Sequence, residues 1–326
     1  MKTALVTAIG SFSADIVIRR LTEMGIRVVG CDIYPREWIA NASMVDRFYN
    51  APLAADPAQY LTFIQNLCLR EQVSYLIPST DVEVDVLDRC REWFPAHGVK
   101  LCLSSHETIA LCRNKARMAK FTSGLDYLRT IPTVHMRDAG PDSLPPFEGF
   151  PLIGKPLDGR SSQGLHRIHT PAQWQHFCTL PDLENYIVQP LIQGSVVTVD
   201  VVRQADGEYT AVIPRQEMLR TLNGAGTSVY VFSDPELEQV CVRLADALKI
   251  IGCVCFEFMK DAGGNYHFIE CNPRFSGGVA FSCVAGYDCV RNHIAAFEGN
   301  AIAPRKPFRN QYIVKKYHEH VTHVEE

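Results

Sequence analysis

The chain has 326 residues, of which 47% are hydrophobic and 21% are charged, and its formal net charge is −4. This length and composition predict an ordinary globular protein with two or three core-bearing units. The weak negative charge gives no overall attraction to nucleic acid or to acidic membranes. No apolar run approaches the length of a membrane span, and the first residues lead into a predicted strand instead of a signal peptide.

The twelve cysteines are scattered along the chain without any Cys-x-x-Cys pair, and several lie within apolar runs. This pattern favours buried thiols in a reducing compartment over disulfides or a zinc site. We therefore expect a cytoplasmic protein whose partners are neither nucleic acids nor membranes.

The N-terminal part alternates between apolar strands and helices. Residues 2–9 and 27–32 predict buried strands, and residues 14–24 predict the helix between them. Such a βαβ unit implies a parallel sheet with a right-handed crossover. The pattern continues with a helix over 57–69 and strands over 73–78 and 99–103.

The first strand–helix turn does not have the glycines of a dinucleotide-binding protein. Asp32 stands where such proteins place the acid that binds ribose, but Gly10 is the only glycine of the Gly-x-Gly-x-x-Gly pattern. Phe12 and Asp15 occupy the other two positions, where a side chain would obstruct a pyrophosphate. The pattern therefore disfavours NAD binding and a dehydrogenase function.

Ser79, Thr80 and Asp81 follow the predicted strand over 73–78. The carboxyl ends of parallel strands are the usual place for ligand contacts. The same residues, with Glu83 behind them, also have the pattern of a helix N-cap. Both interpretations stay open.

A helix over 105–121 carries Asn114 and Lys115, and the first domain is expected to end near it. A Pro-, Gly- and Asp-rich surface loop over 138–149 precedes a strand over 150–156 that contains Lys155. The Gly/Ser loop over 159–164 follows. A strand lysine and such a loop can grip phosphates through a point charge and backbone N–H groups. The alternative is a mobile hairpin tip with a solvated lysine.

The next segments predict strands joined by turns and a few helices. The expected elements are a helix over 171–178, a strand over 184–189, a hairpin over 198–203 and 209–214, a glycine-bearing loop over 222–228, a helix over 235–248, and an apolar helix from beyond 278 to about 298. The tail contains His318, His320 and His323 among charged residues, and we expect it to be solvated.

A β-hairpin is predicted near the C-terminus, with its turn over 261–265. It places Glu257 on the first strand, and Glu270 and Asn272 two residues apart on the second, where they share one face. Two carboxylates and an amide oxygen are a ligand set that suits Mg²⁺. Arg274 points the same way and offers a two-pronged donor for an anion. The alternative is a charged hairpin edge in which Arg274 pairs with Glu270.

The order of four of these elements resembles the ATP-grasp superfamily, closest to its carbamoyl-phosphate-synthase-like and amino-acid-ligase branches. They are Asn114-Lys115, the Lys155 strand with its loop, the strand end at 188–191, and Glu257 with Glu270-x-Asn272-x-Arg274. The resemblance implies an α/β protein: an N-terminal Rossmann-like (pre-ATP-grasp) parallel sheet over 1–111, followed by two α+β ATP-grasp lobes. The lid lobe would cover 112–189, and the core lobe 190–326.

The resemblance also implies ATP and Mg²⁺ as cofactors, with Mn²⁺ as an alternative metal. Lys115 and Lys155 would contact the phosphates, and Arg274 would act with Lys155 in catalysis by steadying the substrate carboxylate and the acyl phosphate. Glu257, Glu270 and Asn272 would hold the metal. The remaining implied nucleotide contacts are Ser161, Ser162 and Gly164 in the lid loop and Gln189, Pro190, Leu191 and Ile192 around the adenine.

Two positions depart from the family pattern. Gln189 stands where an acidic residue is usual, so its carbonyl oxygen would have to accept from the adenine amino group. Ser195 follows Gly194 in place of the glutamate that usually binds ribose, and Asp200 is the residue that could compensate.

The function implied by the resemblance is that of an ATP-dependent carboxylate–amine ligase acting on small molecules. Two alternatives are a carbamoyl-phosphate-synthase-like activity on bicarbonate or carbamate, and a non-catalytic ATP-binding regulator. The sequence leaves the identity of the acid and the amine open, and it leaves a homodimer open.

Overall fold

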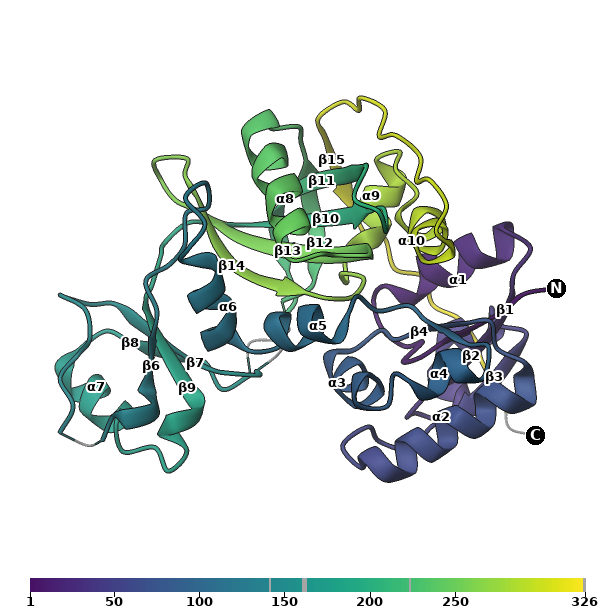
Figure 1. The fold of residues 1–326 in the computed structure, drawn as a ribbon, viewed down its shortest axis with the longest axis horizontal. Coiled ribbons are helices and arrows are strands. Elements are labelled where there is room, and N and C mark those ends of the chain that lie inside the picture. The colour runs from purple at the N-terminus through teal and green to yellow at the C-terminus, as the bar shows by residue number, and fades with distance from the viewer. Residues whose placement is uncertain (141, 160–162, 223, 325–326) are drawn as a thin grey trace.

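A computed structural model describes residues 1–140, 142–159, 163–222 and 224–324 of the chain (Figure 1). Within these residues the strands form a five-stranded sheet, a six-stranded sheet and a four-stranded sheet. The six-stranded sheet lies between the other two in Figure 1, with the four-stranded sheet projecting to one side. Helices are packed against the sheets, so the mixed α/β fold class expected from the sequence is confirmed.

The five-stranded sheet is parallel and has the order β3-β2-β1-β4-β5. Its strands are β1 (Thr3–Val6), β2 (Arg27–Asp32), β3 (Arg47–Asn50), β4 (Tyr75–Ile77) and β5 (Lys100–Leu101). Its helices are α1 (Ala14–Glu23), α2 (Pro57–Glu71), α3 (Asp81–Arg89) and α4 (Trp93–Ala96), with the short turns η1 (Arg36–Trp38) and η2 (Ala40–Ser43) after β2. All four residues of β1 are buried, as a central strand covered on both faces requires.

Local capping explains where the helices of this part begin. The Asp56 side chain accepts the N–H of Gln59, and Pro57 occupies the first turn of α2, where its missing N–H costs nothing. Thr80 and Glu83 form a reciprocal capping box at the start of α3. The helix-cap interpretation of this segment is therefore confirmed.

The four-stranded sheet has the order β6-β9-β7-β8. Its strands are β6 (Val134–His135), β7 (Leu152–Pro156), β8 (His166–Ile168) and β9 (Tyr186–Pro190), and α7 (Pro171–Phe177) packs on it with the turns η3 (Met136–Asp138) and η4 (Leu183–Asn185). Trp174 and Phe177 are buried in a cluster that contains residues of this lobe alone. The four-stranded sheet therefore has its own small core.

The six-stranded sheet is antiparallel and has the order β14-β13-β10-β11-β12-β15. Its strands are β10 (Ser195–Arg203), β11 (Thr210–Arg220), β12 (Gly226–Val231), β13 (Gly252–Lys260), β14 (Tyr266–Asn272) and β15 (Gln311–Val314). Helix α8 (Pro235–Ala247) packs its buried residues against Phe256, Phe258 and Phe268 on one face. The opposite face carries the polar residues described below.

The single helix expected over 105–121 is wrong, because the segment forms two helices. These are α5 (His106–Cys112) and α6 (Lys115–Thr122). Asn114 adopts an extended conformation between them, and its side-chain oxygen accepts the N–H of Arg117 at 3.0 Å. Cys112, Met118 and Leu128 join the core of the six-stranded sheet, so the start of the expected lid lobe packs with the core lobe.

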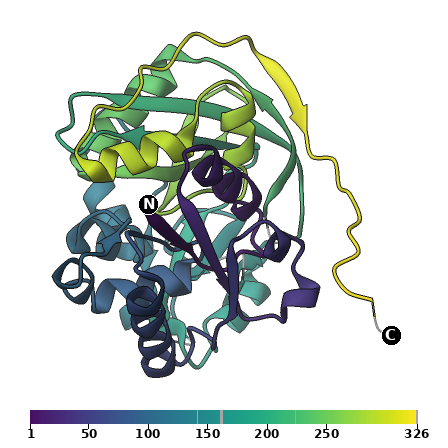
Figure 2. The same cartoon turned by 90° about the vertical axis from the view of Figure 1, so that its right-hand side faces the viewer.

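The C-terminal part also differs from expectation in two ways. The apolar segment after 278 forms two helices, α9 (Val279–Val284) and α10 (Cys289–Glu298), separated by Gly286 with φ +112°. The tail begins with β15, which adds to the edge of β12 before the chain runs along one side of the molecule (Figure 2). Among the described residues, no helix is long and apolar enough to span a membrane.

Candidate active site

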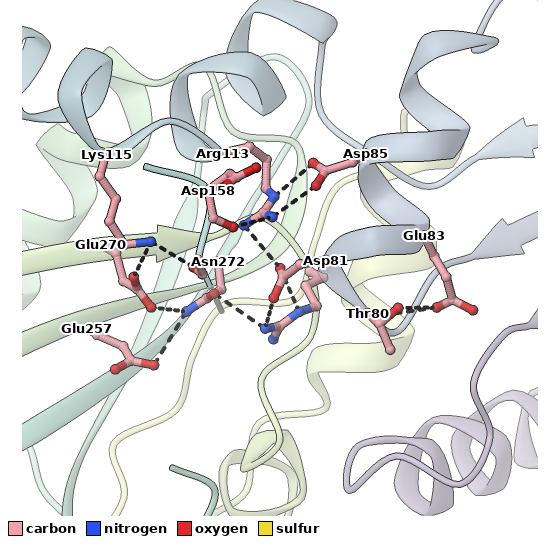
Figure 3. Close-up of polar contacts among 12 residues, drawn as sticks. Thr80, Asp81, Glu83, Asp85, Arg113, Lys115, Asp158, Glu257, Glu270 and Asn272 are labelled. Carbon is pink, nitrogen blue, oxygen red and sulfur yellow. Dashed lines mark hydrogen bonds and ion pairs between the residues drawn. The ribbon is translucent and has the colours of Figure 1, made fainter. Parts of the chain in front are cut away.

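The β13–β14 hairpin holds the predicted metal ligands side by side. Glu257 pairs directly with Glu270, and Cys255 pairs with Asn272. Directly opposed residues of antiparallel strands project from the same face of the sheet. The Asn272 amide nitrogen donates to Glu270 Oε1 at 3.2 Å and to Glu257 Oε1 at 3.4 Å (Figure 3). The hairpin therefore brings the three residues together.

A β-bulge in this hairpin separates the polar face from the core. Glu257 pairs with Glu270, but the next residue, Phe258, pairs with Phe268, so Ile269 is the extra residue. In a regular strand, Phe268 and Glu270 would share one face because they are two residues apart. The bulge lets Phe268 enter the hydrophobic core while Glu270 faces the site.

The environment of Glu257 disfavours its charged form. Burial, and then the neighbouring charge of Glu270, raise the pKa of Glu257 to about 7. A divalent cation between the two groups would reverse this effect, because an adjacent positive charge favours the ionised carboxylate. The metal-free site therefore holds part of its Glu257 in the protonated form at neutral pH.

This donor set fits Mg²⁺ in the way that nucleotide-dependent enzymes hold it. The described residues contain no group of three or more His, Cys, Asp or Glu side chains that could hold a metal alone. The set therefore consists of two carboxylates and the Asn272 amide, and Mg²⁺ commonly completes such a shell with waters and substrate phosphates. The amide nitrogen of Asn272 faces the carboxylates here, so its oxygen would have to turn toward the ion.

Two lysines from different elements lie near Glu270. Lys115, the first residue of α6, has its Nζ 3.8 Å from Glu270 Oε2 and donates to the Gly159 carbonyl at 2.7 Å. Burial lowers the pKa of Lys155 on β7, an effect that Glu270 opposes and Lys115 reinforces. Both lysines and Glu270 line one small cavity between the four-stranded and six-stranded sheets. A ligand with several negative charges would compensate the two ammonium groups.

The same cavity, about 20 Å³ in volume, reaches Gln189 at the end of β9. The Gln189 amide nitrogen donates to the Thr133 hydroxyl at 2.8 Å, whereas its Oε1 is buried and has no hydrogen-bond partner among the described residues. Thr133 thus holds the amide of Gln189, and the oxygen is left as a free acceptor of the kind that recognition of an adenine amino group needs. The predicted adenine contacts that come next in the chain, Pro190, Leu191 and Ile192, do not line this cavity. The Leu191 N–H donates to the Pro151 carbonyl at 3.0 Å.

The chain after β7 is tied to the start of α6. The Lys115 N–H donates to the Leu157 carbonyl at 3.0 Å, and Arg113 Nη2 donates to the Asp158 carbonyl at 3.3 Å. Gly164, with φ +68°, lies against Pro156, where an added Cβ atom would be 2.8 Å from the proline ring. The predicted lid residues Ser161 and Ser162 lie outside the described residues.

Arg274 is held by an acid from the N-terminal sheet. Its Nε and Nη2 donate to the two carboxylate oxygens of Asp81 at 3.0 and 2.7 Å, and Nη2 lies 3.3 Å from Asn272 Oδ1. The expected alternative, in which Arg274 pairs with Glu270, is not what the structure shows. Asp81 is the first residue of α3, next to the N-cap Thr80, and its side chain holds Arg274 at the site.

The predicted ribose contact of Asp200 is contradicted by its position. Its side chain is 0% exposed, and Oδ2 accepts from Arg215 Nη1 at 2.6 Å and from the Ser282 hydroxyl at 2.6 Å. Asp200 is therefore enclosed beneath Arg215 and does not line the cavity that contains the lysines. Its role is to hold a buried guanidinium.

Arg215 and Glu217 are site residues that the sequence did not single out. They alternate on β11, so both face the side that carries Glu257. Arg215 Nε lies 3.5 Å from Glu217 Oε1, which accepts from the Thr198 hydroxyl at 2.9 Å. The period-two charge pattern over 215–217 was the available signal, but β13, the strand that carries Glu257, is distant from β11 in sequence and is joined to it through β10.

A larger cleft, about 860 Å³ in volume, opens between the carboxyl edge of the five-stranded sheet and the polar face of the six-stranded sheet. Its lining includes Glu257, Asn272 and Arg274 on one side and Asp32 and Asp81 on the other. We call it the acceptor-side cleft. Glu270 lines both this cleft and the small cavity that contains the lysines.

Comparison with known proteins identifies the type of fold. Residues 182–320 match a family model described as "ATP-grasp in the biosynthetic pathway with Ter operon". No curated protein matches the sequence significantly.

Several solved structures resemble the whole arrangement. Biotin carboxylase from Campylobacter jejuni, in complex with an ATP analogue, is 18% identical with a TM-score of 0.75, covering 92% of this chain and 72% of its own. N5-carboxyaminoimidazole synthetase from Staphylococcus aureus with ADP is 15% identical with a TM-score of 0.72, covering 93% of this chain and 78% of its own. L-amino acid ligase from Bacillus licheniformis is 14% identical with a TM-score of 0.72, covering 91% of this chain and 74% of its own. At these identities the similarity establishes the fold.

Proposed function

We propose that this chain is an ATP-grasp enzyme, an ATP-dependent, ADP-forming ligase that joins a carboxylic acid to an amine. The family match over residues 182–320 and the fold shared with a biotin carboxylase and an L-amino acid ligase support the proposal. The observation that carries the proposal is the position of Glu270. It lies beside Lys115 on the nucleotide side and lines the acceptor-side cleft as well. A phosphoryl group held there would face an acid bound in the cleft.

The proposed reaction activates the acid before the amine attacks. A carboxylate is a poor electrophile, and transfer of the γ-phosphoryl group gives an acyl phosphate with a good leaving group. Glu257, Glu270 and Asn272 would hold Mg²⁺, which supplies positive charge to the phosphate oxygens. Lys115 and Lys155 would pair with the same oxygens from the lid side. The amine then forms the C–N bond and releases phosphate.

Arg274 would orient the acid at the metal site. Asp81 holds its guanidinium beside Asn272, so the arginine is positioned before a substrate arrives. Asp81 occupies the Nε–Nη2 edge of the guanidinium, so a carboxylate or a developing acyl phosphate would meet its Nη1 side, where one N–H donates to the Phe275 carbonyl at 3.1 Å. For nucleotide recognition we propose Gln189 Oε1 as acceptor for the adenine amino group, with backbone groups of residues 190–192 beside the ring.

Three units would share this work. We assign the N-terminal domain (1–111) to one wall of the acceptor-side cleft, the lid lobe (112–189) to the phosphates, and the core lobe (190–326) to the metal. Packing of α5 and α6 on the six-stranded sheet places the start of the lid lobe with the core, so the moving part would begin later in the chain.

Phosphate release decides the proposal. The protein would be incubated with ATP, Mg²⁺ and a panel of carboxylic acids and amines, with Mn²⁺ replacing Mg²⁺ in a parallel series. We expect ADP and phosphate only when metal and a suitable acid are present. Release of AMP and pyrophosphate, or no turnover with any acid, would contradict a ligase of this type and favour an ATP-binding regulator.

A second candidate acid is bicarbonate. Two of the similar structures are a biotin carboxylase and an N5-carboxyaminoimidazole synthetase, and a related carboxylase structure contains a bicarbonate anion. Bicarbonate-free buffer separates the cases, because a carboxylating or carbamoyl-phosphate-forming enzyme would then lose its phosphate release. One related structure is described as a dimer, and sedimentation of this protein would test a homodimer.

A further inference from the structure

The acceptor-side cleft has two chemically different walls. The wall from the six-stranded sheet is charged and carries the proposed metal ligands and Arg274. The opposite wall, from the five-stranded sheet, exposes the large apolar side chains of Phe12, Tyr34, Trp38 and Leu53 to the cleft. We call these four residues the apolar wall.

The apolar wall is built at the ligand-binding edge of a parallel sheet. Phe12 follows β1, Tyr34 and Trp38 follow β2, and Leu53 follows β3, and these three strands are neighbours in the sheet. Loops at the carboxyl ends of parallel strands meet at one edge, where such folds bind their ligands. Residues far apart in the sequence therefore form one surface.

This surface is more exposed than a purely structural role requires. Trp38 is 74% exposed, and its ring lies 6.0 Å from that of Tyr34 at an angle of 31°. Grouped exposed apolar side chains in a cleft mark a binding surface. The C-terminal segment reaches this region through a bond from the Thr322 hydroxyl to the Glu37 carbonyl, but Val321 remains exposed and does not cover the wall.

The polar groups near this wall are already used within the protein. Asp32 accepts the N–H groups of Gly10 and Tyr34 at 2.8 and 3.1 Å, and the Asn41 amide donates to the Ile9 carbonyl at 2.7 Å. The Lys315 ammonium lies 4.5 Å from the centre of the Phe12 ring and donates to the Gly277 carbonyl. A ligand on this side therefore meets the four apolar side chains beside polar groups that already have partners.

We propose that the acid bound in the acceptor-side cleft carries an aromatic side chain, with its ring on the apolar wall and its carboxylate toward Arg274. The cleft volume of about 860 Å³ accommodates such a molecule. The placement of the carboxylate rests on the proposed ligase function, whereas the placement of the ring rests only on the exposed residues of the apolar wall. The two parts can therefore fail separately.

Direct binding tests the proposal without any turnover. Calorimetry would compare two matched pairs of probes, 3-phenylpropionate against propionate and L-phenylalanine against L-alanine. We expect at least one aromatic member to bind roughly tenfold or more tightly than its small partner, because stacking and apolar burial act only on the ring. Equal affinities within both pairs would overturn the proposal.

Substitutions locate the binding on the wall. Trp38→Ala and Leu53→Ala should remove most of the preference for the aromatic probe while the affinity for ATP with Mg²⁺ stays unchanged. Leu69→Ala is the matched control for Leu53→Ala, because the two leucines are 54% and 59% exposed but Leu69 lies on α2 outside the cleft. An aromatic preference that survives Trp38→Ala would place the ring elsewhere and contradict the proposal.

Two further results would distinguish failure of the ligase function from failure of the aromatic-ligand proposal. Selective aromatic binding without phosphate release would reject the ligase function and keep the apolar wall. Concentration-dependent dimerisation that Trp38→Ala abolishes would assign the wall to a second copy of the chain, and would overturn the proposal.

Discussion

Glu270 connects the two halves of the candidate site through its contacts with Lys115 and Asn272. We expect Glu270→Gln to lower metal-dependent phosphate release by roughly two to three orders of magnitude, the scale of losing one strong electrostatic contact in a transition state. The amide has nearly the same shape, so the fold should persist. Circular dichroism would verify this, and the exposed Glu236→Gln is the control. Normal turnover in folded Glu270→Gln would refute the metal assignment.

Arg274 separates a ligase from a passive nucleotide binder. If its guanidinium steadies the acid and the acyl phosphate, Arg274→Ala should reduce kcat strongly while the affinity for ATP changes little. Arg274→Lys should rescue poorly, because an ammonium group cannot keep the two parallel hydrogen bonds to Asp81 and also reach the substrate. Calorimetry for ATP and a phosphate-release assay would be run on all three proteins. Equal phosphate release would show that Arg274 serves only to pair with Asp81.

The raised pKa of Glu257 predicts a pH-dependent metal affinity. Below about pH 7 the metal-free carboxyl is protonated, and a metal binds the ionised form, so binding must displace a proton. The affinity for ATP with Mg²⁺ should therefore fall as the pH decreases from 8 to 6. Calorimetry at several pH values would measure this. In Glu257→Gln the affinity should be weaker and its pH dependence flatter, and an unchanged slope would contradict the assignment.

At the scale of elements, Asn114 shows how a cap changes a helix prediction. The residues over 105–121 have helical character throughout, but the Asn114 side chain accepts the Arg117 N–H and starts a second helix. We expect Asn114→Ala to lower the free energy of unfolding by about 1 kcal/mol, the usual value of such a cap. Asn114→Asp should retain the cap. Urea denaturation of the three proteins would measure the difference.

Local patterns predicted the hairpin and the site residues on it, because alternation and a glycine turn fix both strands within a short stretch of chain. The bulge at Ile269 could not be foreseen, since it depends on which side the core lies. The contact between Arg274 and Asp81 spans 193 positions, so only the assembled fold reveals it. Asp200 failed as a predicted ribose contact because it is enclosed by Arg215 from the neighbouring strand and by Ser282, which lies 82 positions away on α9.

At the scale of the whole molecule, the four-stranded sheet has a separate core, whereas the other two sheets are joined by shared packing. A lobe with its own core can move as a unit around a bound nucleotide. We expect a non-hydrolysable ATP analogue with Mg²⁺ to decrease the radius of gyration in solution scattering. Lys155→Ala should reduce this decrease, and an unchanged radius in the wild-type protein at saturating analogue would argue against closure.

The shared packing also has a consequence for the order in which the chain folds. Val17 and Leu21 of α1 lie in the same apolar cluster as Val290 and Ile294 of α10, and the end of α10 contacts Lys2 and Tyr75 through Glu298. During synthesis at about 5–20 residues per second, the first helix waits roughly 15–50 seconds for this partner. The side of α1 that packs on α10 is therefore uncovered on the nascent chain, and it stays exposed to other apolar segments until the last helix arrives.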